Sequence, residues 1–172
     1  MSFKLSKKFW EIHECDHLSN DLDKAGVFYT TIIGEEMKNY ANAVHSKYRI
    51  DQSPKVEITS TDFPRNTISN KRGDVKHAER TFASLFSGQE IYYFRRWRGE
   101  FNSLHAKKIF CLDGKDFASL GIGFMPAMEA TFCLPDMSFV VVAHFSHFYQ
   151  YAGESGTLWD HADKFIQKMY NV

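Results

Sequence analysis

The sequence of 172 residues has few cysteines, few prolines and no linker-like segment. Its 3 cysteines, Cys15, Cys111 and Cys133, are far apart and form no Cys-x-x-Cys pair, which argues against a disulfide scaffold and favours reduced, buried thiols. Only 4 prolines occur, and no stretch rich in Pro, Ser and Gly divides the chain. We therefore expect a single domain over residues 1–172, with a helical part at about 1–50 and a sheet-containing part at about 55–172.

Long apolar runs and catalytic signatures are also lacking. The strongest apolar run, Phe139–Ala143, is much shorter than the roughly 20 residues that a membrane-spanning helix needs. The lysines near the N-terminus are not followed by the apolar stretch of a secretory signal peptide, so we expect a cytoplasmic protein without membrane contact. No nucleophile elbow and no phosphate-binding loop occurs, and we expect no cofactor.

The chain has no net charge, because 21 basic side chains balance 21 acidic ones. A strongly basic nucleic-acid binder is therefore disfavoured. The balance is uneven along the chain, however: residues 61–110 hold 10 basic and 5 acidic side chains, whereas residues 111–172 hold 3 and 7. Such blocks either form a partner surface or neutralise each other within the fold, and the sequence leaves both possibilities open.

What the sequence has in quantity is apolar and aromatic residues, at 44% and 16%, which is enough to bury a core. The clearest helix covers 35–48, where Met37, Ala41 and Val44 fall on one face. Three further helices are predicted at 19–33, 76–86 and 157–170. Runs of β-branched and aromatic residues predict strands at 55–59, 90–98, 107–112, 130–134 and 138–146.

The order of these elements predicts an α+β domain with a mostly antiparallel sheet of about five strands, flanked by N-terminal helices and a C-terminal helix. Pro135–Met137 suits a tight turn between the last two strands. The run 138–146 is apolar on both faces, as expected for an interior strand covered on both sides. The polar segment 62–74 and the glycine- and aromatic-rich segment 149–156 are predicted as loops.

One segment has the spacing of a zinc site. His13 and His17 enclose Glu14 in the His-Glu-x-x-His form of zinc metalloproteases, in which two histidines one helical turn apart chelate the metal. The charged Asp16 stands where that motif carries an uncharged residue. If the segment is a strand, the two histidines lie about 13 Å apart. A small metal-dependent hydrolase is therefore an alternative, and a polar segment without metal is favoured.

A second histidine pair, His144 and His147, follows the most apolar run. Strand alternation sends the two side chains to opposite faces unless the strand ends between them. They are weak metal candidates, and histidines packed at the rim of the core are the simpler interpretation.

The stretch 92–98 interleaves aromatic rings with arginines. A strand of this kind can stack nucleic-acid bases and hold phosphates, which makes a nucleic-acid-binding domain the second alternative. The same residue types also dominate protein-binding hot spots. A core strand with arginines at its exposed end is the structural explanation.

The interpretation that we favour is a protein-binding module, most specifically an inhibitor or immunity-type protein of the kind found in bacteria. Such proteins cover a basic site of a toxin-like partner through a charged surface. The residues predicted to contact the partner come from the acidic last third and from the arginine-rich strand. They are Glu154, Asp160, Asp163, Tyr149, Tyr151, Arg95, Trp97 and Arg98.

Overall fold

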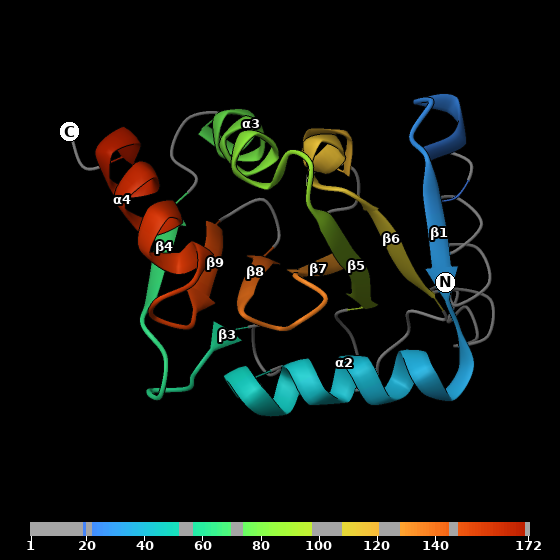
Figure 1. Cartoon of the computed structure of the whole chain (residues 1–172), viewed down its shortest axis with the longest axis horizontal. Coiled ribbons are helices and arrows are strands. Elements are labelled where there is room, and N and C mark those ends of the chain that lie inside the picture. The colour runs from blue at the N-terminus through green and yellow to red at the C-terminus, as the bar shows by residue number, and fades with distance from the viewer. Residues whose placement is uncertain are drawn as a thin grey trace, which may run out of the picture.

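A seven-stranded antiparallel sheet forms the centre of the structure, which is a computed structural model (Figure 1). It describes residues 19, 22–51, 57–69, 74–97, 108–120, 128–144 and 148–170. In spatial order the strands are β1 (Tyr29–Ile32), β6 (Ile109–Asp113), β5 (Glu90–Trp97), β7 (Met128–Cys133), β8 (Phe139–His144), β9 (Phe148–Gly153) and β4 (Arg65–Ser69). Two shorter strands, β2 (Ile50–Asp51) and β3 (Glu57–Ile58), pair separately.

Helices cover both faces of the sheet. Helix α2 (Gly34–Tyr48) packs on one face, and helices α3 (Asp74–Phe86), η1 (Gly114–Leu120) and α4 (Leu158–Tyr170) pack on the other (Figure 1). The α+β class and the helices predicted at 35–48, 76–86 and 157–170 are confirmed. None of the helices in the described ranges combines the length and apolarity that crossing a membrane requires.

Strand β8 shows why the sheet needs both layers. Val141 faces the aromatic core under α3 and α4, whereas Val140 and Val142 face the core under α2. All three are fully buried, because successive side chains of a strand point to opposite faces. The predicted interior strand is confirmed. So is the hairpin at Pro135–Met137, which joins β7 to β8 in antiparallel register.

The helix predicted at 19–33 is wrong in its second half. A helical turn at 22–24 ends at Gly26, whose φ of 69° is accessible to glycine, and the amide of Val27 donates back to the carbonyl of Leu22. The chain then becomes strand β1, which pairs with β6. The β-branched run that begins at Thr30 therefore follows its strand propensity.

Two segments that we predict as loops contain strands, so the sheet has more strands than expected. Strand β4 lies within the polar segment 62–74, and β9 occupies most of 149–156. Strand β9 looks like a loop because of Gly153, yet a Cβ there would lie 2.9 Å from a ring carbon of Phe139. This glycine serves close packing and not a turn. Of the strand predicted at 55–59, the described residues 57–58 form β3, which lies outside the main sheet.

Candidate functional site

The acidic residues predicted to meet a partner at the C-terminal end gather around the start of α4, and each is engaged by the fold. Asp163 accepts a hydrogen bond from the Tyr151 hydroxyl at 2.8 Å. Asp160 accepts one from the amide of Gly156 at 2.9 Å, which ties the first turn of α4 to the chain before it. Glu154 forms an ion pair with Lys47. Their contact with a partner stays a prediction, but each carboxylate already has a structural role.

The two tyrosines of this predicted surface do not lie on it. Tyr149 and Tyr151 are buried in the core under α3 and α4. The Tyr149 hydroxyl donates to the carboxylate of Glu79 at 3.0 Å, on α3. Strand alternation explains this placement, because both rings point to the helix-covered face of β9. They support the fold beneath the surface.

The other predicted site residues fall mainly outside the described parts. Arg95 and Trp97 are placed as backbone in β5, opposite Ala130 and Met128 of β7, without a description of their side chains. His144 is placed in the same way, as the last residue of β8. The residues His13, His17, His147 and Arg98 lie outside the described residues. Within the described ranges, no three His, Cys, Asp or Glu side chains gather as metal ligands.

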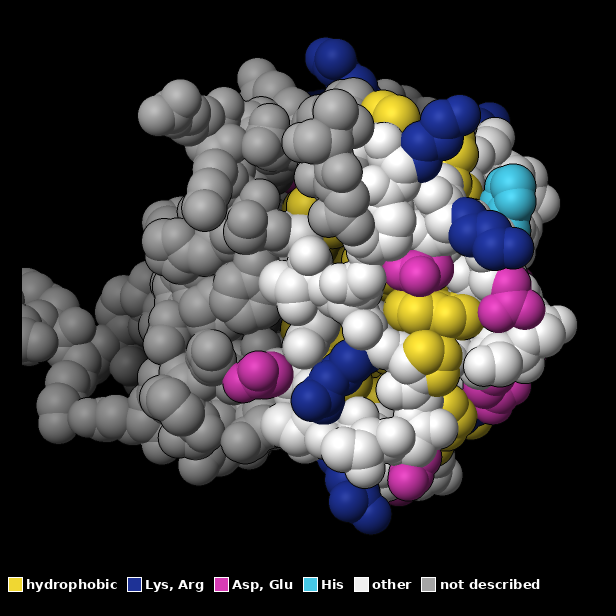
Figure 2. All heavy atoms as spheres, turned by 90° about the vertical axis from the view of Figure 1, so that its left-hand side faces the viewer, with side chains coloured by type: hydrophobic (Ala, Val, Ile, Leu, Met, Phe, Trp, Pro, Cys, Tyr) yellow, Lys and Arg dark blue, Asp and Glu magenta, His cyan; other side chains and the backbone are white. Residues whose placement is uncertain are grey.

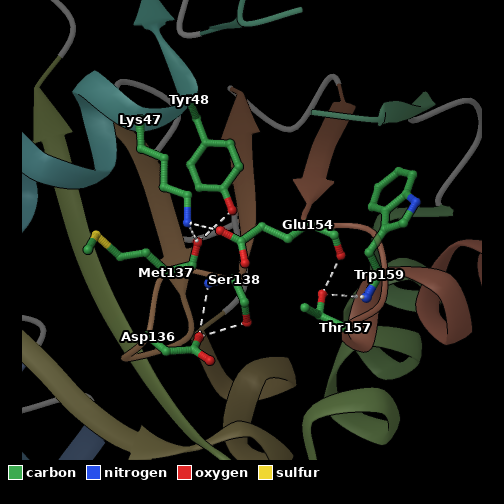
Figure 3. Close-up of polar contacts among 8 residues, drawn as sticks. All are labelled: Lys47, Tyr48, Asp136, Met137, Ser138, Glu154, Thr157 and Trp159. Carbon is green, nitrogen blue, oxygen red and sulfur yellow. Dashed lines mark hydrogen bonds and ion pairs between the residues drawn. The ribbon is translucent and has the colours of Figure 1, made fainter. Parts of the chain in front are cut away.

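A polar cluster joins helix α2 to the turn of the β7–β8 hairpin (Figure 3). Lys47 and Tyr48 both donate to the carbonyl of Met137, at 2.9 and 2.6 Å, and Lys47 also contacts Glu154. Met137 itself adopts the left-handed conformation, with φ of 60°, in the turn of the hairpin. In this cluster Glu154, from the acidic last third of the chain, is neutralised by Lys47, from the first third. The cluster therefore stabilises the fold.

A groove that contains none of the predicted site residues lies near the edge of the sheet formed by β1, far from β9 and β4. It has a volume of about 540 Å³. Cys111 faces the α2 side of the sheet, so Thr30 beside it and Asp113 two residues further along β6 face the same side. The acidic groove, as we name it, is lined by Gly26, Phe28, Thr30, Glu90, Cys111, Leu112, Asp113, Lys115 and Asp116.

Like charges face each other across two strands in this groove. Glu90 of β5 and Asp113 of β6 are directly opposite in the antiparallel register. In general, like charges directly opposite each other on neighbouring strands disfavour the pairing. Asp116 adds a third carboxylate, and Lys115 is the one basic side chain among the described lining residues. With three carboxylates and one basic side chain, the described lining of the groove carries an excess of negative charge.

The charge at the groove is held in place by backbone donors. The Asp113 carboxylate accepts from the amides of Lys115 at 2.8 Å and Gly88 at 3.1 Å. These hydrogen bonds keep the pKa of Asp113 below its ordinary value. A neighbouring hollow of about 360 Å³ shares Glu90 and extends to Asp136, whose pKa is lowered by hydrogen bonds from Ser138. The negative surface therefore continues towards the hairpin turn.

The thiol in the groove is unsuited to nucleophilic chemistry. Burial raises the pKa of Cys111, and the nearby carboxylates of Glu90 and Glu36 add to the effect. Burial, followed by the charges of Glu90, Cys111 and Glu36, also raises the pKa of Tyr92, which stands opposite Cys111. A protonated thiol is a poor nucleophile, and a thiol reactive at neutral pH needs a positive environment. Cys133 lies on the other side of Tyr92, two strands from Cys111 and too far for a disulfide.

Exposed apolar side chains stand at both ends of β1, and one of them lines the groove. Phe28 lines it with 83% of its surface exposed, and Ile33, at the far end of β1, is 62% exposed. Both exposed fractions exceed those of the two exposed apolar residues of α4, Phe165 at 37% and Met169 at 41%. Exposed aromatic residues beside a polar rim are typical of protein-binding surfaces.

The face at the other side of the molecule has a different charge pattern. Figure 2 shows this face, at the side of α4 and β4, with basic and acidic side chains interspersed around a narrow strip of hydrophobic ones in its coloured part. Mixed charge of this kind is ordinary for a solvated surface. Of the two regions, the acidic groove is the better candidate site.

No protein-family model, no curated protein and no solved structure matches this chain. The candidate site therefore depends on its geometry alone. The charge balance of the sequence segments predicts only part of the acidic groove, because Glu90 belongs to the basic segment 61–110 and Asp113 to the acidic segment 111–172. Their meeting depends on the β5–β6 register, which the sequence does not disclose.

Proposed function

We propose that this protein is a protein-binding module of the inhibitor or immunity type, and that it covers a basic surface of its partner with the acidic groove. The observation that carries the proposal is the directly opposed pair Glu90 and Asp113, beside the exposed ring of Phe28. A repulsive pair is costly to the free protein and becomes favourable when a cation lies between the two carboxylates. An arginine or lysine of a partner would supply that cation.

Recognition is favoured over catalysis by the chemistry of the lining. The carboxylate of Asp113 is fixed by two backbone amides, so it is oriented before a partner arrives. The thiol of Cys111 is kept protonated by its surroundings. An aromatic anchor next to fixed negative charge matches the composition of protein interfaces, in which rings supply affinity and charges supply specificity and association rate.

The test begins with affinity purification of the protein from a lysate of its source organism. The partner that is captured is then identified and purified. Binding is measured by isothermal titration calorimetry at several salt concentrations, for the native chain and for the double variant Glu90→Gln, Asp116→Asn. We expect the double variant to bind about tenfold more weakly at low salt and to lose most of the salt dependence.

Asp62→Asn is the matched control, because Asp62 is an exposed carboxylate on the connection between β3 and β4. It should leave the affinity within about twofold. An affinity that Glu90→Gln, Asp116→Asn does not change, or that falls only with substitution of Glu154 and Asp160, would contradict the proposal. In the second case the α4 region would be the binding surface.

A further inference from the structure

We infer that strand β1 is a docking edge, to which a basic, extended segment of the partner adds as an eighth strand. The inference rests on the proposed function, because the acidic groove that borders β1 selects the charge of the segment. In this binding mode, main-chain hydrogen bonds supply affinity and alternate side chains supply specificity.

The first observation is the position of β1. It lies at the end of the sheet, and among the described residues it pairs only with β6 (Figure 1). The side chains of Thr30 and Thr31 are exposed, and the exposed residues Phe28 and Ile33 stand at either end of the strand. An edge strand of this composition has no proline and no charged side chain to block further pairing.

The opposite edge of the sheet is protected, which makes the contrast informative. Strand β4 begins with Arg65, whose guanidinium donates to the carbonyls of Ile58 and Ser60. The side chain of Asn66 contacts Asp163 of α4. Charged and anchored side chains are a common means of preventing edge-to-edge pairing. Among the described residues, β4 thus carries anchored side chains, whereas β1 has no pairing partner on its outer side.

The charges around β1 determine what can bind there. On the groove side, Glu90, Asp113 and Asp116 lie beside Thr30. Beyond Ile33, the exposed residues Glu35 and Glu36 begin helix α2. A segment paired with β1 places every second side chain over the groove, because side chains alternate along a strand. Lysine or arginine at those alternate positions complements the groove, and an apolar residue complements Phe28.

A second copy of the chain is the competing occupant, and charge disfavours it. Two β1 strands that pair antiparallel across a two-fold axis bring Glu35 and Glu36 of each copy towards the acidic groove of the other. Like charges at an interface oppose association. The structure therefore favours a basic partner segment over self-association.

The experiment uses a capped eight-residue peptide of alternating lysine and valine as the probe, with an alternating glutamate and valine peptide as the charge control. Binding is measured by calorimetry, and the amides of Tyr29–Ile32 are followed by hydrogen exchange. We expect the lysine peptide to bind and to slow exchange in β1 by about tenfold, and the glutamate peptide to do neither.

Two matched protein variants place a lysine on each edge of the sheet. Thr31→Lys blocks β1, and Thr67→Lys, at an exposed threonine of β4, is its control. We expect Thr31→Lys to lower the affinity for the lysine peptide by about tenfold, and Thr67→Lys to lower it by less than about twofold. Unchanged circular dichroism and melting temperature would show that both variants fold.

The outcomes separate this inference from the proposed function. If the lysine peptide binds in a salt-dependent way that needs Glu90 and Asp116, yet β1 exchange and Thr31→Lys have no effect, strand addition is overturned and the groove function stands. If the groove substitutions leave the affinity for the natural partner unchanged, the proposed function itself is overturned. A dimer by light scattering that Thr31→Lys dissociates would show a second copy on β1, and would overturn the inference.

Discussion

Single side chains of helix α2 hold the hairpin that shapes the middle of the sheet. Tyr40 donates to the carbonyl of Leu134 at 2.8 Å, while Lys47 and Tyr48 donate to that of Met137. Burial raises the pKa of both tyrosines, so their hydroxyls stay protonated and remain donors over the physiological pH range. The periodicity of 35–48 predicts which residues face inward, but not that three of them end on backbone carbonyls.

We predict that Tyr48→Phe lowers the free energy of unfolding by about 1 kcal/mol, the net worth of one buried hydrogen bond. The loss stays moderate because Lys47 continues to donate to the carbonyl of Met137. Urea unfolding checks the value. Lys38→Ala is the control, since its ion pair with Glu35 is exposed. A Tyr48→Phe variant as stable as the native chain would show that this hydroxyl does not stabilise the hairpin.

A second prediction at this scale concerns pH. The Ser138 hydroxyl and amide donate to Asp136 at 2.7 and 2.9 Å and lower its pKa. A carboxyl with a lowered folded pKa contributes stability above its unfolded pKa of about 4, and this contribution is lost as pH falls through the folded value.

The substitution Ser138→Ala removes the hydroxyl donor, which is the larger of the causes that lower the pKa of Asp136. We expect its pKa to rise towards the ordinary value, so that the stability lost on acidification becomes smaller and the loss is complete at a higher pH. Carboxyl-carbon NMR titration measures the pKa. Asp113 is the internal control, because its donors are backbone amides far along the chain. An unshifted Asp136 would contradict the assigned cause.

At the scale of elements, prediction from sequence succeeds where one local signal dominates. Helix α2 has an uninterrupted apolar stripe, and β8 has an apolar run that admits few alternatives. Strands β4 and β9 pair with each other, and neither shows the pattern of an isolated strand, because β4 is polar and β9 contains Gly153. Their conformation depends on pairing and packing between distant segments, which local propensity does not describe.

The junction between α3 and η1 gives a prediction for these elements. Helix α3 ends at Phe86, and a Cβ on Gly114 would lie 2.2 Å from the Cβ of Phe86. The amide of Gly114 also donates to the carbonyl of Gln89 at 2.8 Å, which fixes the approach. We expect Gly114→Ala to cost about 2 kcal/mol or more, because the two elements must separate.

Gly88→Ala is the comparison, since Gly88 has open space around it but a φ of 78°. We expect a cost of about 1 kcal/mol there, from backbone strain alone. Thermal unfolding of both variants checks the order. A Gly114→Ala variant less affected than Gly88→Ala would show that the α3–η1 contact is looser than the structure has it.

For the whole molecule, the acidic residues of the last third fall into two groups, one around α4 and one in the acidic groove. The carboxylates around α4 contact Lys47, the amide of Gly156 and Tyr151. In the acidic groove, Asp113 is held by the amides of Gly88 and Lys115 and stands opposite Glu90 in the β5–β6 register. The sequence indicates that charge matters in the last third, and it cannot separate these two groups, because the separation depends on the strand order of the sheet.

The two groups should respond in opposite ways when charge is removed. Glu154→Gln breaks the ion pair with Lys47, and we expect a loss of about 0.5 kcal/mol, since the Glu154 side chain is 42% exposed and water screens the pair. Glu90→Gln removes the repulsion with Asp113. We expect the stability to be maintained or to rise by about 0.5 kcal/mol at low salt, with the gain disappearing at high salt.

Urea unfolding at two salt concentrations measures both changes, with Asp62→Asn as an exposed carboxylate that should leave stability unchanged. A variant that is more stable and yet binds the partner less well would identify Glu90 as a residue kept for binding at the expense of the free protein. If Glu90→Gln instead destabilises the chain as much as Glu154→Gln does, the groove carboxylates are structural, and the case for an acidic binding site at β1 is lost.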